Sequence, residues 1–345
     1  MKKSLAFIYG GRGLEREVSL LGADFLLPII NKVGYSCIPI YIDADGRWLV
    51  SREGDSFVRP DIYANRECAG LINFGGRGGI CLGGEAVMID CAFPLLHGDF
   101  GEDGTVQGAL ENAAIPYVGE GVLTSALCLD KVACRSFADM LSIKGAGWIA
   151  MPLGITSEEA ADMAEKKLTY PMFVKPRSLG SSIGAGRADD RNGLILAYNE
   201  ASAKRKRRVI IEELVNIECE LEIGVLRRKG KYIFTKIGKI KNYSSFYSYG
   251  EKYSADSFAE IDPDYVADTK TEQAILQMAE LLVASLELKS LARMDFFLDK
   301  NGKIYFNEIN TMPGFTQSSL FWKLFSRVGI SPEELVVALV EEAIP

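Results

Sequence analysis

The fold is decided by residues 293–314, RMDFFLDKNGKIYFNEINTMPG, which have the pattern of two strands joined by a tight turn. The dipeptide Asn301-Gly302 is a strong signal for a two-residue hairpin loop, because both positions tolerate a positive φ. A four-residue loop would keep the same side chains on one face, whereas a three-residue loop would break that arrangement. The length of the loop therefore decides which side chains face each other.

A two-residue loop places Asp295 directly opposite Glu308. In the same register Arg293 lies opposite Asn310. Opposed residues have Cβ atoms about 5 Å apart, so two carboxylates repel unless a cation or a proton lies between them. Carboxylate oxygens with an added amide suit Mg²⁺. The pattern therefore predicts a metal site, and the alternative is a solvated hairpin with scattered acids.

Length and composition indicate a globular protein of two or three domains. The chain has 345 residues, of which 48% are hydrophobic and 25% are charged. A net charge of −7 argues against nucleic acid as a partner, and the apolar runs are too short for a signal peptide or a membrane span. The seven cysteines are scattered without a CxxC pair, which favours free thiols. We therefore expect a cytoplasmic protein with no membrane partner.

The first part of the chain has the pattern of an α/β domain. An apolar run ends in Gly10-Gly11, a helical pattern follows at 15–27, and a second strand is predicted at 35–42. Residues 44–86 are rich in Gly and Arg and predict an irregular excursion with short strands. The glycines lack the GxGxxG spacing, which argues against a dinucleotide-dependent dehydrogenase. The order of elements indicates a parallel sheet with a ligand-facing loop after the first strand.

Two lysines have the setting of phosphate-binding residues. Lys175 lies in an apolar strand pattern, and a buried ammonium needs an anion as its partner. The loop at 178–184, SLGSSIG, follows that strand, and its backbone N–H groups and the hydroxyls of Ser181 and Ser182 could approach phosphate oxygens. Such a loop is more often a plain turn. Lys131 lies at the start of a helical pattern and could bind the same anion. The alternative is that Lys131 is an ordinary lysine on the surface.

Three further polar positions lie where α/β proteins bind ligands. His97 precedes a turn rich in glycine and acids at the end of a strand pattern, which favours a ligand-facing role over a structural one. Glu212 ends a strand whose backbone could pair with an adenine edge, and the alternative is a solvated acid. Glu15 could hold a substrate ammonium. The alternative is a solvated acid that the dipole of the nearby helix stabilises.

Together these segments resemble the D-alanine–D-alanine ligases of the ATP-grasp superfamily, over nearly the whole chain. The motifs that carry the resemblance are GGRGLEREVSL (10–20), FPLLHGDFGEDGTVQGALENAAIPYVG (93–119), LDK (129–131), FVKPRSLGSSIG (173–184), IIEELV (210–215), GEKYSAD (250–256) and RMDFFLDKNGKIYFNEINTMPGFTQSSL (293–320). The resemblance implies α/β and α+β architecture, in a three-domain ATP-grasp fold with an N-terminal parallel-sheet, Rossmann-like domain.

The resemblance also implies the limits of the domains and an assembly. It implies a substrate-binding domain at 1–122, a central ATP-grasp subdomain at 123–211 and a C-terminal ATP-grasp subdomain at 212–345. A lid is expected at about 242–256, and ATP is expected between the two ATP-grasp subdomains. A homodimer through the N-terminal domain is implied by the family.

The family's nucleotide and metal roles carry over to matching positions. The resemblance implies that ATP contacts Lys131, Lys175, Ser182, Glu212, Val215 and Glu220. It implies that two Mg²⁺ ions, for which Mn²⁺ can substitute, bind to Asp295, Glu308 and Asn310. The segment from Glu212 to Glu220 is one residue longer than in some relatives, which makes the ribose contact at Glu220 less secure.

The substrate roles carry over in the same way. The resemblance implies that Glu15, Ser181 and Tyr253 form a hydrogen-bond triad that closes the site, with Glu15 also holding the first substrate ammonium. Arg293 and the Gly314 N–H are expected to hold the oxyanion. The remaining substrate contacts are implied at His97, Lys252, Ser319 and Leu320.

The activity implied by the resemblance is ATP-dependent ligation of two D-alanine molecules through a D-alanyl phosphate, for the synthesis of peptidoglycan precursors. The alternative is ligation of D-alanine to D-serine or D-lactate on the same scaffold. Tyr253 favours an amine nucleophile, and Leu320 argues against D-serine. Two positions depart from the family pattern: Gly13 replaces a usual Ser or Thr, and Ser318 replaces a bulkier residue in the second-substrate pocket.

Overall fold

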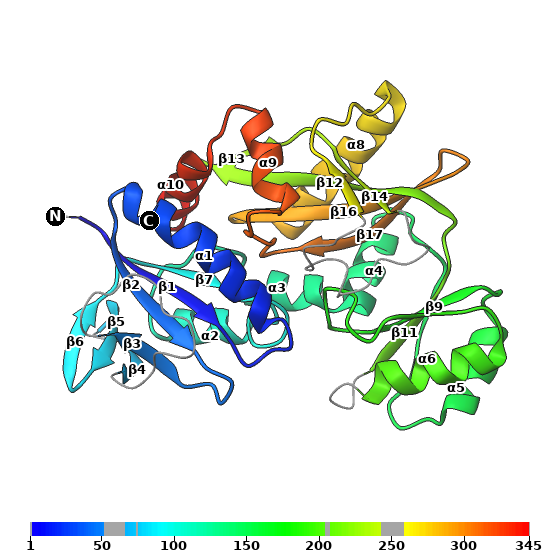
Figure 1. Ribbon diagram of the computed structural model, residues 1–345, viewed down its shortest axis with the longest axis horizontal. Helices are drawn as coiled ribbons and strands as arrows, with labels where there is room; N and C mark the ends of the chain where they lie inside the picture. Colours follow the sequence, from blue (N-terminus) through cyan, green and yellow to red (C-terminus); the bar gives the residue numbers. More distant parts are fainter. Residues whose placement is uncertain (1, 52–65, 74, 204–207, 243–258, 345) are drawn as a thin grey trace.

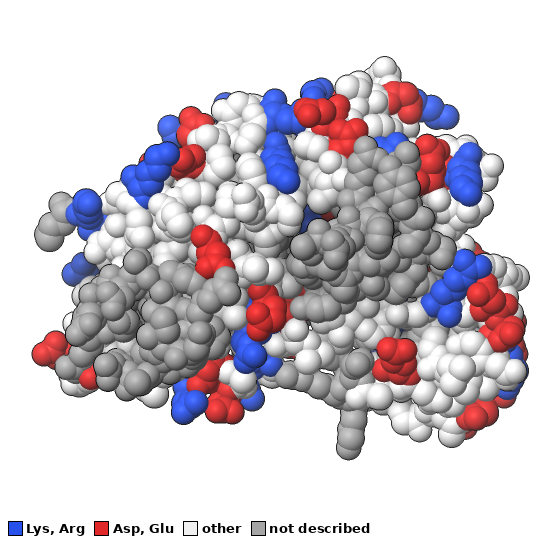
Figure 2. Space-filling model, viewed as in Figure 1, with Lys and Arg blue, Asp and Glu red and all other residues white. Residues whose placement is uncertain are grey.

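Figure 1 shows a mixed α/β protein built around three β-sheets. The computed structural model describes residues 2–51, 66–73, 75–203, 208–242 and 259–344. Lys252, Tyr253 and nearly all of the predicted lid at 242–256 lie outside the described residues. Within the described ranges, none of the helices has the length and apolar character needed to cross a bilayer. On the face shown in Figure 2, basic and acidic side chains are interspersed.

The first sheet has seven strands in the order β6-β5-β4-β3-β2-β1-β7. Its elements are β1 (Ser4–Gly10), α1 (Arg16–Lys32), β2 (Ser36–Ile42), β3 (Trp48–Ser51), β4 (Arg66–Asn73), β5 (Gly78–Leu82), β6 (Glu85–Met88), β7 (Cys91–Leu95) and α2 (Thr105–Asn112). β1 pairs in parallel with both β2 and β7, as the strand–helix–strand pattern predicts. β3 to β6 extend the sheet through antiparallel pairs, so the sheet is mixed and its parallel strands lie at one end.

The second sheet has four antiparallel strands in the order β10-β9-β11-β8. After α3 (Val122–Leu129) and α4 (Lys131–Met140) come β8 (Trp148–Ala150), α5 (Ser157–Glu165), β9 (Met172–Pro176), β10 (Gly186–Ala188), α6 (Arg191–Ala203) and β11 (Val209–Glu213). α5 and α6 lie side by side (Figure 1), and they cover a core that includes Val174, Leu194 and Ile211. The helices occupy one face of this sheet, which leaves its other face for the cavity described below.

The third sheet is antiparallel in the order β15-β14-β12-β16-β17, with β13 paired to β12. Its elements are β12 (Ile217–Arg228), β13 (Lys231–Phe234), β14 (Gly238–Asn242), β15 (Ala259–Asp262), α8 (Thr269–Leu286), β16 (Leu291–Asp299), β17 (Ile304–Asn310), α9 (Leu320–Arg327) and α10 (Pro332–Ala343). The long strand β12 and its neighbour β16 form the centre of this sheet. α10 starts with Pro332 after the N-cap Ser331, whose hydroxyl accepts from the Glu334 N–H.

The first and third sheets share one hydrophobic core. Side chains of β1, α1 and β7 pack there with side chains of α9 and α10. The rings of Phe93 and Phe315 meet edge to face at 6.2 Å between centroids. At the same junction, the Glu120 carboxylate accepts from the backbone N–H groups of Lys289 and Ser290, each at 2.8 Å. The second sheet, by contrast, has a core of its own.

Candidate active site

The predicted hairpin forms, but its loop has three residues instead of two. β16 ends at Asp299, whose backbone N–H donates to the carbonyl of Lys303 over 2.9 Å. The Asp299 carboxylate accepts from the N–H groups of Asn301 and Lys303, each at 2.8 Å, and Gly302 has a φ of 77°. The Asp299 side chain therefore stabilises a longer loop than the Asn-Gly dipeptide indicates, and the two-residue prediction was wrong.

A β-bulge in β17 offsets the longer loop. On the loop side Phe296 pairs with Phe306, and beyond it Asp295 pairs with Glu308, so Asn307 is the extra residue. The bulge lets Phe306 meet Phe296 in the core, with ring centroids 5.8 Å apart, whereas a straight ladder would turn Phe306 away from it. The register predicted for the far end of the hairpin is confirmed.

A cavity of about 750 Å³ lies between the three sheets. Its lining includes every predicted site residue that the structure describes, namely Glu15, His97, Lys131, Lys175, Ser181, Ser182, Glu212, Val215, Glu220, Arg293, Asp295, Glu308, Asn310, Gly314, Ser319 and Leu320. The other two, Lys252 and Tyr253, lie outside the described residues. Segments far apart in the chain thus meet in one space, while the role of each residue remains a prediction.

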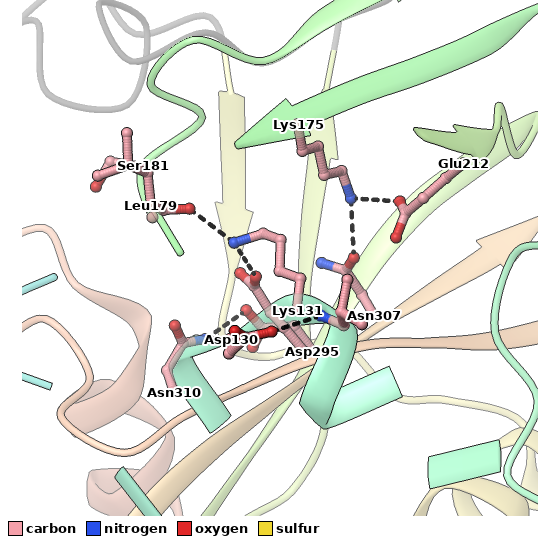
Figure 3. Close-up of polar contacts among 12 residues, drawn as sticks. Asp130, Lys131, Lys175, Leu179, Ser181, Glu212, Asp295, Asn307 and Asn310 are labelled. Carbon is pink, nitrogen blue, oxygen red and sulfur yellow. Dashed lines mark hydrogen bonds and ion pairs between the residues drawn. The ribbon is translucent and has the colours of Figure 1, made fainter. Parts of the chain in front are cut away.

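Lys175 enters this cavity from β9. Alternation along the strand buries Val174 against α6 and turns Lys175 to the opposite face. Its ammonium lies 2.7 Å from Glu212 Oε2 and 3.4 Å from Asn307 Oδ1, as Figure 3 shows. Burial raises the pKa of Glu212, but the charges of Lys175, Arg135 and Lys131 together outweigh burial, and the net pKa is lowered. Glu212 therefore stays ionised.

Lys131 enters from the start of α4. The helix is capped by Asp130, whose carboxylate accepts from the N–H groups of the next turn. The Lys131 ammonium donates to the Leu179 carbonyl at 2.7 Å and lies 3.4 Å from Glu308 Oε2. Figure 3 shows Lys131 and Lys175 directed into the same space beside the hairpin residues. This arrangement brings two ammonium groups into the same part of the cavity, each beside a carboxylate.

Arg293 forms a two-bond ion pair with Asp295 within β16. Its Nε and Nη2 donate to the two oxygens of Asp295, each at 2.7 Å, and its Nε lies 3.3 Å from Glu222 Oε1. Asn310 Nδ2 donates to Asp295 Oδ2 at 2.9 Å. Burial lowers the pKa of Arg293, but Asp295 and Glu222 raise it further, and the net pKa lies well above its ordinary value. The guanidinium is therefore always charged.

The hairpin offers a donor set that fits a divalent cation. Asp295 and Glu308 supply hard oxygens from opposed positions, and Asn310 can add its amide oxygen because its nitrogen is turned to Asp295. Among the described residues, no three His, Cys, Asp or Glu side chains converge on a point that could hold a metal. The two carboxylates turn instead toward Arg293 and Lys131.

Glu15 connects the first sheet to the loop at 178–184. Ser181 Oγ donates to Glu15 Oε1 at 2.6 Å, and the Gly180 N–H donates to Oε2 at 3.3 Å. Ser181 and Ser182 have φ values of 53° and 57°, a left-handed backbone that residues with a Cβ rarely adopt. Such a conformation is typical of a loop shaped for a ligand. Two members of the predicted triad are therefore in direct contact.

His97 is held between the first and third sheets. Burial lowers its pKa to about 4, so the imidazole is neutral at pH 7. Its Nδ1 lies 3.9 Å from Glu102, and its buried Nε2 has no hydrogen-bond partner within the described part of the chain. Glu102 accepts from the N–H groups of Gly98 and Met312 at 2.8 and 3.2 Å. Glu102 thereby joins the His97 turn to the loop that follows β17.

The start of α9 also lines the cavity. Ser319 Oγ accepts from the Thr316 N–H at 2.9 Å and makes no capping bond to its own helix. A Cβ at Gly314 would lie 3.1 Å from that hydroxyl, so the glycine keeps the space clear. Leu320 is buried, and its backbone N–H belongs to the first turn of α9. Free N–H groups of a first helical turn suit a carboxylate.

Sequence reasoning missed three side chains that shape the site. Asn307 is the bulge residue that contacts Lys175. Glu222 contacts Arg293, and its spacing of two from Glu220 on one strand was a usable signal. Arg135 is 2% exposed, and it donates to the carbonyls of Phe306 and Ala146 at 2.7 and 2.6 Å. It braces the backbone just before the bulge.

Comparison with known proteins agrees with this geometry. A family model described as "D-ala D-ala ligase N-terminus" matches residues 4–120, and one described as "D-ala D-ala ligase C-terminus" matches residues 142–341. The chain belongs to the D-alanine–D-alanine ligase family. Its ATP-grasp architecture is that of the family, as the sequence motifs predicted.

Relatives of this ligase family match over the full chain. "D-alanine--D-alanine ligase" of Geobacillus kaustophilus is 37% identical over 100% of this chain and 95% of that protein. The one of Chloroherpeton thalassium is 34% identical over 99% and 96%. Among solved structures, the VanG D-Ala:D-Ser ligase of Enterococcus faecalis has a TM-score of 0.87 at 31% identity, with 100% of both chains covered. The D-alanine-D-alanine ligase of Coxiella burnetii has a TM-score of 0.86 at 26% identity, over 99% and 94%.

Proposed function

We propose that this chain joins two D-alanine molecules to D-alanyl-D-alanine with the use of ATP, for the synthesis of peptidoglycan precursors. The names of its full-length relatives support this activity. The observation that carries it is the single cavity in which Lys131 and Lys175 face the acidic hairpin. Concentrated cations opposite paired carboxylates suit a nucleotide triphosphate with its metal.

The nucleotide lies between the second and third sheets in this proposal. Lys131, Lys175 and Ser182 contact its phosphates, and Glu212, the Val215 backbone and Glu220 contact adenine and ribose. Before ATP binds, Lys175 is held by Glu212 at 2.7 Å, so Lys175 exchanges one anionic partner for another when it contacts the phosphates. Asp295, Glu308 and Asn310 would hold two Mg²⁺ ions, or Mn²⁺ in their place, and the bound ions would neutralise phosphate charge.

The reaction has two steps in this proposal. The carboxylate of the first D-alanine, whose ammonium is held by Glu15, attacks the γ-phosphorus of ATP; ADP leaves and D-alanyl phosphate forms. The amine of the second D-alanine then attacks the acyl carbon. Arg293 and the Gly314 N–H stabilise the oxyanion of that tetrahedral state, and phosphate leaves. His97 lines the pocket as a neutral imidazole, because its pKa is lowered to about 4 by burial.

The second substrate is bound at the start of α9. We assign its carboxylate to Ser319 and to the N–H groups of the first helical turn at Leu320, because both residues line the cavity. Acyl phosphates hydrolyse in water, so the site must close during the reaction. Residues 242–256 are assigned as the lid, with Lys252 near the phosphates and Tyr253 in the triad with Glu15 and Ser181.

Three finer points belong to the same proposal. The domains end near residues 122 and 211, the protein works in the cytoplasm, and it forms a homodimer through its N-terminal domain. D-alanine and ATP are its partners, with no membrane and no nucleic acid.

Phosphate release from ATP and Mg²⁺ tests the function directly. We expect release that depends on D-alanine and is not supported by L-alanine. Mass analysis of the product separates D-alanyl-D-alanine from the D-serine dipeptide and the D-lactate ester. A protein that folds and binds ATP but releases no D-alanine-dependent phosphate would refute the proposal.

A further inference from the structure

Three acidic residues form a row across neighbouring strands in the cavity. β12 pairs with β16, and β16 pairs with β17, in a register that aligns Glu222, Asp295 and Glu308. Directly opposed residues share one face of a sheet, and all three line the cavity. The proposed metal site uses Asp295 and Glu308, whereas Glu222 has no role in it.

Arg293 lies beside this row and contacts two of its members. It binds Asp295 through two nitrogens at 2.7 Å and lies 3.3 Å from Glu222. The third member, Glu308, lies 3.4 Å from Lys131 instead. The guanidinium therefore has a close partner in Asp295 and a second anion within reach.

The proposed duties of Asp295 and Arg293 conflict in this arrangement. Both oxygens of Asp295 accept hydrogen bonds from Arg293, and Oδ2 also accepts one from Asn310. A divalent cation bound to Asp295 would lie beside the guanidinium, and repulsion between the two positive charges would weaken the bonds between Arg293 and Asp295. A buried charge without a partner is costly, so the guanidinium then needs another carboxylate.

We infer that Glu222 is the carboxylate to which Arg293 shifts when Asp295 turns to the metal, so that Glu222 is a positioning residue for Arg293. This inference rests on the proposed function. Glu222 is 4% exposed, and its strand is paired on both sides, with β14 and β16. A fixed anion at this position keeps the guanidinium beside the reacting carbonyl instead of letting it follow Asp295 or turn to solvent.

A double-mutant cycle tests this shift without the need for turnover. The measured quantity is the Mg²⁺ concentration that gives half-maximal binding of a non-hydrolysable ATP analogue. It is compared in the wild type, Glu222→Gln, Arg293→Gln and the double variant. Glu222→Gln alone is expected to raise this concentration about tenfold or more, because releasing Asp295 would leave Arg293 unpaired. In the Arg293→Gln background the same change is expected to have an effect below about twofold.

Two outcomes would overturn the inference. An equal increase in both backgrounds would mean that Glu222 acts on the metal itself, and no increase in the wild-type background would mean that it has no part in metal binding. Asp264→Asn is the matched control, because it removes the acid of an exposed pair with Arg327 at 2.9 Å, and no change is expected. If Glu222→Gln does not fold, Glu222→Asp takes its place in the cycle with the same criteria.

Turnover gives a second and separate readout. With D-alanine, Glu222→Gln is expected to lower kcat more than it raises the KM for ATP, because Arg293 acts on the tetrahedral state. A wild type without D-alanine-dependent phosphate release would refute the proposed function, while the binding cycle would still decide the role of Glu222.

Discussion

At the scale of single residues, one substitution tests the proposed metal role of Glu308 separately from folding. It opposes Asp295 across the hairpin and lies 3.4 Å from Lys131. Glu308→Gln keeps the shape but removes the charge, so we expect turnover to fall by about a thousandfold or more while thermal stability changes little. Phosphate release and a melting curve measure the two effects. Glu272→Gln, in an exposed pair with Lys236, is the control; turnover equal in both variants would contradict the metal role.

Variants of the Lys175–Glu212 ion pair can separate the contribution of Lys175 to nucleotide affinity from its contribution to thermal stability. Lys175→Met removes the proposed phosphate contact and also leaves the buried Glu212 without the ammonium beside it, so nucleotide affinity and melting temperature should both fall. We expect affinity for ATP to drop at least about tenfold. Adding Glu212→Gln should recover stability, because the stranded charge is gone, without restoring affinity. Calorimetric titration with ATP and thermal unfolding report the two quantities, and undiminished affinity would leave Lys175 a purely structural role.

At the scale of elements, the bulge in β17 lets Phe306 and Glu308 both keep their partners on β16. Deletion of Asn307 should give a regular ladder in which Phe306 still faces Phe296 and Glu308 still faces Asp295. We therefore expect Mg²⁺-dependent nucleotide binding to persist in the deletion variant, weakened only by loss of the Asn307 contact with Lys175. Asn307→Gly is the control, because it removes the same side chain but keeps the extra residue, and titration calorimetry should give similar affinities for the two variants. Loss of binding in the deletion variant alone would show that the bulge itself is needed to place Glu308.

The same hairpin shows how far the sequence could predict this element. The opposition of Asp295 and Glu308 was predictable, because period-two alternation and the turn signal confine the possible registers. The three-residue loop was not, since it depends on Asp299 folding back onto the loop N–H groups. The bulge depends on Phe306 fitting beside Phe296, a contact that exists only in the folded core. The predicted loop was one residue too short, and the bulge adds one residue that was not predicted. These two errors cancel, so the register at Asp295 and Glu308 is right.

At the scale of the whole molecule, the motifs predicted one site but not what holds it together. Sixteen described site residues line one cavity, and their family motifs were visible in the sequence. The supports were not visible: Arg135 behind the bulge, and Glu120 and Glu102 at the domain junctions. Each depends on backbone groups that lie far away in the chain, and no local pattern encodes such partners.

Glu120 gives the junction of the first and third sheets a pH dependence. Burial raises its pKa from 4.5 to about 7, although the N–H groups of Lys289 and Ser290 lower it in part. Between these values the folded state keeps a proton that the unfolded state loses, so this group makes stability fall as pH rises. The full effect is about 3 kcal/mol at most. Melting temperatures from pH 4 to pH 8 should therefore fall less steeply in Glu120→Gln than in the wild type; parallel curves would contradict this assignment.

The core shared by the first and third sheets bears on how the chain can be cut into fragments. A polypeptide that ends at residue 122 would leave Phe93 and the inner face of α1 without the aromatic cover supplied by Phe315 and α9. The autonomous piece is instead the middle of the chain, whose apolar interior draws only on residues between 149 and 211. Removal of that middle segment should leave the core shared by the first and third sheets covered. Separation of the first sheet from the third should expose that shared core to water.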